Sequence, residues 1–98
     1  MMHLITLALL LASWSADPQQ GPGATYKSTK SISALQNCLT KKLTRIGDVT
    51  DVTVDGVTTL MIREAPNEAA MVIDLAPASV TVTTNFLYGT RKLVEACL

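Results

Sequence analysis

The apolar positions of this chain follow a helical spacing first and an alternating spacing afterwards. Between Ser31 and Arg45, apolar residues recur at three- and four-residue steps, which is typical of one face of an α-helix. These positions are Ile32, Leu35, Cys38, Leu39, Leu43 and Ile46. Ser28, Thr29 or Ser31 can supply the N-cap hydroxyl, and Gly47 is a natural stop. The pattern predicts a first helix over 31–45.

The pattern then changes to short alternating runs separated by turn residues. These runs predict four strands, at 49–54, 57–64, 69–75 and 79–85. We expect the inward residues of the last two strands to be Met71, Ile73, Leu75, Val80 and Val82. Because the connections are short, neighbouring strands should pair as an antiparallel meander.

The register of the first hairpin is open from the pattern alone. Asp55-Gly56 tolerates the positive φ of a two-residue turn, which would place Val52, Val54, Val57 and Met61 on one face. A glycine bulge at Gly56 would shift that assignment by one residue. Of the two arrangements, we favour the one in which Leu60 and Ile62 face the helices.

A second helix is expected to begin between Asn85 and Thr90, with Thr90 as the N-cap, and to end the chain. Leu93, Val94 and Cys97 then share one face. The sequence therefore predicts an α+β fold in the order α-β-β-β-β-α. We expect a two-layer sandwich in which two helices cover one face of an antiparallel sheet of three to four strands, with threonines on the other face.

The N-terminal residues have the pattern of an export signal. Leu4–Ala12 is an uncharged apolar run, and Ser13 and Ser15 are small residues that suit signal-peptidase cleavage before Ala16. We expect a signal peptide over 1–15, a flexible Pro- and Gly-containing leader over 16–29, and a single α+β domain over 30–98. The apolar run is shorter than the roughly 20 residues that a membrane span requires. Retention as an uncleaved anchor is the alternative.

Export bears directly on the two cysteines, Cys38 and Cys97. Two lone cysteines in an oxidising compartment usually pair, so we expect a structural disulfide between them. Closing so long a loop should stabilise the fold by roughly 4 kcal/mol. A catalytic thiol is disfavoured, because the chain has no Cys-x-x-Cys pair and its single histidine, His3, lies in the signal peptide.

Composition narrows the function classes further. The chain carries eight basic and eight acidic residues, which argues against an electrostatic site for nucleic acid or an anionic membrane. Asp48, Asp51 and Asp55 could be read as a metal or acid–base cluster, but their spacing differs from that of a calcium loop. We therefore assign no catalytic, cofactor-binding or metal-binding residue, and expect no cofactor.

The segments Asn37-Cys38-Leu39 and Ala96-Cys97-Leu98, together with the layout of residues 28–98, carry a resemblance. The chain resembles small exported bacterial proteins of unknown function that have a helix, antiparallel strands and a C-terminal helix linked by one disulfide. The resemblance implies an exported or periplasmic location and a disulfide. It implies no activity.

The expected role is that of a binding or interaction module in the bacterial envelope, whose partner is another exported protein. The threonine-rich sheet face or an edge strand could receive that partner by strand addition. The alternatives are a tethered structural protein that keeps its N-terminal segment, and a small enzyme that uses the carboxylates. The oligomeric state is left open.

Overall fold

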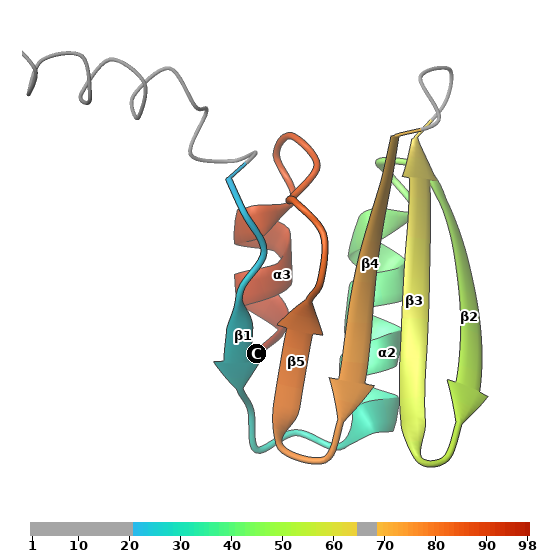
Figure 1. Cartoon of the computed structure of the whole chain (residues 1–98), viewed down its shortest axis with the longest axis vertical. Coiled ribbons are helices and arrows are strands. Elements are labelled where there is room, and N and C mark those ends of the chain that lie inside the picture. The colour runs from blue at the N-terminus through green and yellow to red at the C-terminus, as the bar shows by residue number, and fades with distance from the viewer. Residues whose placement is uncertain (1–20, 65–68) are drawn as a thin grey trace, which may run out of the picture.

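The computed structural model describes residues 21–64 and 69–98 (Figure 1). In chain order the elements are β1 (Thr25–Lys27), α2 (Ile32–Leu43), β2 (Asp48–Val54), β3 (Val57–Glu64), β4 (Ala69–Ala76), β5 (Ser79–Val82) and α3 (Arg91–Cys97). The signal peptide expected over 1–15, the start of the expected leader and the connection expected between the second and third predicted strands, residues 65–68, lie outside the described residues. The α+β class and the expected element order are confirmed for α2 to α3.

All five strands form one antiparallel sheet in the order β1-β5-β4-β3-β2 (Figure 1). The last four strands make the expected meander, in which each strand pairs with the next along the chain. β1 pairs with β5 at one edge, and β2 forms the opposite edge. The segment that contains α2 therefore carries the chain from one edge of the sheet to the other.

The expected strand count was one too low, because β1 lies in the segment predicted as a flexible leader. Its three residues show no hydrophobic period, and backbone pairing with β5 is what orders them. The Val82 N–H donates to the Ala24 carbonyl over 2.8 Å, and the Phe86 N–H donates to the Gly21 carbonyl over 3.0 Å. The part of the leader from Gly21 onward thus lies along β5.

The first hairpin has the two-residue turn without a bulge. Val54 pairs with Val57, and Asp55 and Gly56 have φ values of 51° and 81°, as a type I′ turn requires. This register sends Leu60 and Ile62 to the helix side, where both are fully buried. The preferred assignment is therefore confirmed.

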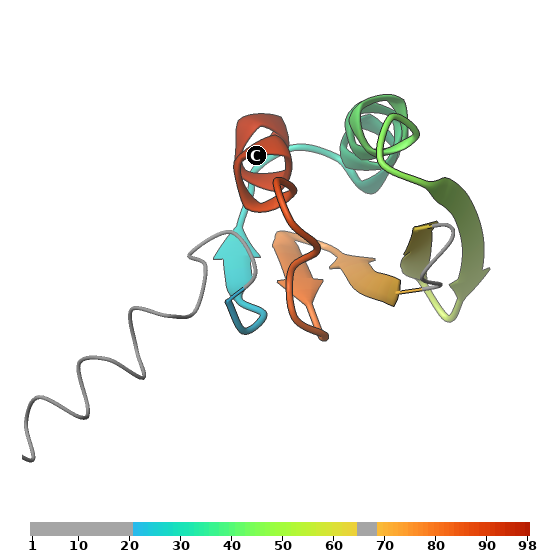
Figure 2. The same cartoon turned by 90° about the horizontal axis from the view of Figure 1, so that it is seen from above.

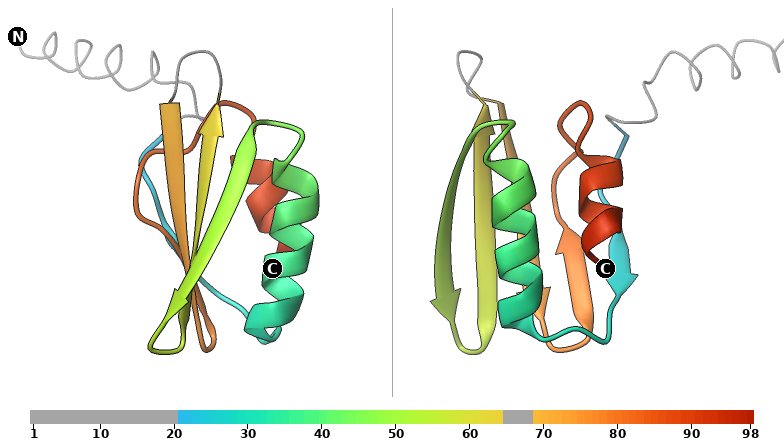
Figure 3. Two further views of the ribbon diagram at one scale, coloured as in Figure 1. Left: turned by 90° about the vertical axis from the view of Figure 1, so that its right-hand side faces the viewer. Right: turned by 180° about the vertical axis from the view of Figure 1, so that it is seen from behind.

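Both helices lie on the same side of the sheet, as Figure 2 shows from above. α2 packs on β2, β3 and β4, and α3 lies beside α2 (Figure 3). The core between the two layers consists of Leu35, Leu39, Leu43, Leu60, Ile62, Met71, Ile73, Leu75, Val80, Val82, Phe86, Leu87, Val94 and Cys97. In the described parts of the chain, no helix has the length and apolar character needed to cross a membrane.

The end of α2 and the capping of α3 differ in detail from the expectation. The Ser31 hydroxyl caps α2 by accepting from the Ala34 N–H, but α2 ends at Leu43 rather than at residue 45. Thr90 precedes α3 as expected, yet its hydroxyl donates backwards to the Leu87 carbonyl over 2.7 Å instead of capping the helix. Gly47 lies beyond the helix end, where a β-carbon would overlap the Arg63 carbonyl oxygen. Close approach of the chain to β3, and not helix termination, is what requires glycine there.

This contact gives a matched pair of glycine variants. Gly47→Ala should lower the free energy of unfolding by about 2 kcal/mol or more, because backbone atoms of β3 must move to admit the methyl group. Gly56→Ala meets no atom within 4 Å and should cost only about 1 kcal/mol, from its positive φ. Urea unfolding of the oxidised protein measures both. A smaller loss for Gly47→Ala than for Gly56→Ala would contradict the assignment.

Candidate functional site

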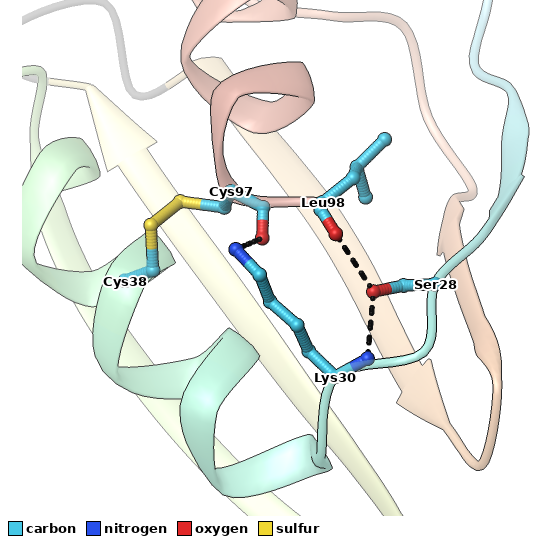
Figure 4. Close-up of a disulfide and its surroundings, with 5 residues drawn as sticks. All are labelled: Ser28, Lys30, Cys38, Cys97 and Leu98. Atoms are coloured by element: carbon cyan, nitrogen blue, oxygen red, sulfur yellow. Dashed lines mark hydrogen bonds between the residues drawn. A yellow bond between two sulfur atoms is a disulfide. The ribbon is translucent and has the colours of Figure 1, made fainter.

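The two cysteines form the expected disulfide. Cys38 in the middle of α2 and Cys97 at the end of α3 are joined with a Cα–Cα distance of 5.8 Å (Figure 4). Cys97 is fully buried and Cys38 is half-buried, so the bond lies at the inner side of the helix layer. No free cysteine remains. The bond fixes the distance between the two helices above the sheet.

The end of α3 is held by a second set of contacts from the segment before α2. The Lys30 ammonium donates to the Cys97 carbonyl over 2.9 Å, and the Ser28 hydroxyl donates to the Leu98 carbonyl over 3.1 Å (Figure 4). Ser28 also accepts from the Lys30 N–H. A cation suits the negative end of the helix dipole, so Lys30 neutralises carbonyl groups that the helix itself cannot satisfy.

Tyr26 attaches β1 to the same helix. Its hydroxyl donates to a Glu95 carboxylate oxygen over 2.8 Å. Burial raises the pKa of the Tyr26 phenol above its usual value, and the hydrogen bond to the Glu95 carboxylate and its negative charge act in the same direction.

Arg91 stacks over the Phe86 ring with 4.3 Å to the centroid, which ties the start of α3 to the loop before it.

The three aspartates considered as a metal or acid–base cluster are not brought together. Asp48 and Asp51 point to opposite faces of β2, and Asp55 lies in the turn beyond its end. Among residues 21–64 and 69–98, no three His, Cys, Asp or Glu side chains converge as a metal site. Asp51 instead accepts a hydrogen bond from the Gln36 amide of α2 over 2.6 Å.

The sheet face away from the helices, called the open face below, carries a mixture of hydroxyl, apolar and charged side chains. The strand registers place on it Thr25, Lys27, Asp48, Thr50, Val52, Val54, Val57, Thr59, Met61, Arg63, Ala70, Val72, Asp74, Ala76, Ser79 and Thr81. Thr59 donates to Asp74 over 2.7 Å, and the Thr25 and Thr81 hydroxyls lie 3.3 Å apart. These four residues form a polar row across the sheet, as expected of the outer face.

Not every threonine lies on the open face. Thr53 and Thr58 are opposite one another on the helix side, with their hydroxyl oxygens 2.8 Å apart. Thr58 is almost fully buried there. The contact gives the buried Thr58 hydroxyl a hydrogen-bonding partner at the rim of the core, where Thr53 itself is exposed.

β2 is a seven-residue edge strand, and no other part of the described chain pairs with its outer side. In the left view of Figure 3 it lies in front of the sheet with its outer side toward the viewer. Val52 and Val54 are 57% and 61% exposed and are neighbours on the open face of this strand. An uncovered edge of this kind is available for pairing with another extended segment.

Beside this edge, on the helix side, an open groove runs between α2 and β2. It is lined by Gln36, Asn37, Thr40, Lys41, Thr44 and Asp51. The Gln36–Asp51 hydrogen bond spans the groove. Hydrophobic periodicity does not indicate this groove, because its lining residues on α2 are polar and lie away from the apolar stripe. Only the tertiary structure brings them beside Asp51 of β2.

The disulfide should dominate the stability of the domain. Replacing both Cys38 and Cys97 by Ala should lower the free energy of unfolding by about 4 kcal/mol, since the bond closes a loop with a sequence separation of 59 residues. Chemical unfolding of the variant and of the reduced wild-type protein measures this loss twice. Equal stability of oxidised and reduced protein would show that the bond contributes nothing.

Tyr26→Phe tests the contact between β1 and α3. The variant should be about 1 kcal/mol less stable near neutral pH, because a hydrogen bond to a carboxylate at a partly exposed site is lost. The raised pKa means that the stabilisation is complete below the unfolded tyrosine pKa of about 10 and disappears as the pH rises through the folded value. Urea unfolding at neutral and strongly alkaline pH should therefore show the difference shrinking. Tyr88→Phe, at a side chain 58% exposed, is the control and should leave stability unchanged.

No family model, curated protein or solved structure matches this chain. What can be stated of its class comes from its own structure. It is an α+β fold in which one disulfide links the two helices over a single antiparallel sheet.

Proposed function

We propose that this protein is a small exported module that binds another exported protein by contact, without catalysis, and that the β2 edge is the surface it uses. The observation that carries the proposal is the seven-residue edge strand β2, which carries two exposed valines and whose outer side pairs with none of the residues that the structure describes. Strand addition supplies affinity through backbone hydrogen bonds, so it needs no specialised side-chain chemistry on the receiving protein.

Two further features support this role. The disulfide and the contacts to the end of α3 hold the helix layer together, and the sheet that presents β2 rests on that layer. A binding edge that is already ordered loses little conformational entropy when a partner docks. The apolar N-terminal run, the resemblance to exported disulfide-linked proteins and the disulfide itself support an exported or periplasmic location.

The proposal can be tested by photo-crosslinking in the cell that makes the protein. A photoreactive amino acid at position 52 should yield a crosslink to one discrete partner, on material whose N-terminus is Ala16 and which is recovered outside the cytoplasm. The same probe at position 88 is a matched control, since Val52 and Tyr88 are 57% and 58% exposed but Tyr88 lies in the loop before α3. A partner captured equally from both positions, or a probe at 52 that crosslinks to nothing, would overturn the proposal.

A further inference from the structure

The hydrogen-bonding groups on the outer side of β2 can be assigned residue by residue. In a two-residue hairpin the residues that flank the turn exchange both backbone bonds, and bonded and non-bonded pairs alternate from there. Because Val54 pairs with Val57, the even-numbered residues of β2 bond to β3. The backbone groups of Val49, Asp51 and Thr53 therefore point outward, to where an added strand would lie.

The side chains on the two faces of an added strand would lie beside different kinds of residue of β2. On the open face its side chains would lie beside Val52 and Val54, whose exposure makes an apolar, β-branched neighbour favourable. On the helix side the side chain opposite Asp51 would enter the groove between α2 and β2. Alternate residues of the partner would therefore be apolar and polar.

The charge near this edge is acidic. Asp51 and Asp55 lie opposite no cation in the hairpin, whereas Asp48 lies opposite Arg63. The Asp51 carboxylate is held in place by the Gln36 amide, at 2.6 Å. Lys41 also lines the groove, but its side chain is exposed and long enough to turn into solvent. The positioned charge that a partner meets is therefore negative.

We propose that the β2 edge binds an extended peptide segment in antiparallel orientation, with a Lys or Arg opposite Asp51 and β-branched apolar residues opposite Val52 and Val54. Read along the partner, this is an apolar–polar–apolar–basic pattern. The proposal rests on the proposed function and names the chemistry of its partner.

A second copy of the chain is a poorer occupant for the same edge. Antiparallel pairing of two β2 strands would bring the acidic residues of both copies together, and like charges across a strand pair are destabilising. Acidic residues on an edge strand also prevent such self-pairing. A partner with a basic residue opposite Asp51 avoids this repulsion between carboxylates, whereas a second copy of the chain introduces it.

The test uses the oxidised full chain and a displayed library of random nine-residue segments. Selected segments should share the apolar–polar–apolar–basic pattern. For one such synthetic peptide, Asp51→Asn should weaken binding about threefold and Asp51→Lys about tenfold, and Glu at the basic position of the peptide should restore binding to Asp51→Lys. Asp55→Asn removes the same charge from the turn and should change the affinity by less than about twofold.

Thr53→Pro tests backbone pairing at the β2 edge independently of the charge of Asp51. The Thr53 N–H points outward, so proline removes a bond to the partner without removing a backbone bond to β3. Proline also removes the hydroxyl contact with Thr58, and Thr53→Val, which loses that contact but keeps the N–H, is the matched control and should bind the peptide as the wild type does. The proline variant should lose the peptide while retaining the disulfide and the wild-type circular dichroism spectrum.

Peptides that bind Thr53→Pro unchanged would overturn both the edge and the proposed function. Peptides that fail to bind Thr53→Pro but bind Asp51→Lys as tightly as the wild type would overturn only the basic residue of the partner. A stable dimer that Thr53→Pro abolishes would assign the edge to a second copy of the chain.

Discussion

The disulfide between Cys38 and Cys97 is the constraint on which the rest of the structure depends. α3 has only seven residues, and a helix of that length does not form by itself in water. It is ordered because a covalent bond attaches it to the longer α2 and because Lys30 and Ser28 bind the carbonyl groups at its end. The place of α3 in the helix layer follows from these attachments, while α2 covers the sheet through the buried side chains of Leu35, Leu39 and Leu43.

The same attachments explain why a segment without hydrophobic periodicity becomes part of the domain. β1 is joined to β5 through its backbone and to α3 through the Tyr26–Glu95 hydrogen bond. It thereby forms one edge of the sheet and leads directly into the residues that anchor the end of α3. That edge is a strand of three residues, whereas β2 presents seven residues at the other edge. The greater length of β2 is what makes it the candidate binding surface.

The three aspartates of the first hairpin show that the role of a residue depends on its position in the fold. Clustered in sequence, Asp48, Asp51 and Asp55 suggest shared metal or acid–base chemistry. In the fold the first faces away from the helices opposite Arg63, the second is held by Gln36, and the third occupies the turn. The three carboxylates therefore do not form a joint site, and each contributes its charge separately along β2 and its turn.

The sequence by itself determined the elements whose signal is local, namely the apolar stripe of α2 and the place of the turn at Asp55-Gly56. It left the register of that hairpin open, and the pairing of Val54 with Val57, which buries Leu60 and Ile62, decided it. The sequence also determined the disulfide partners, since two cysteines allow one intramolecular pairing. Only the tertiary structure decided that β1 lies beside β5, that Gly47 approaches Arg63, and that Asp51 meets Gln36 beside an uncovered edge. These features depend on contacts between segments distant in sequence, and hydrophobic periodicity carries no information about which segments those are.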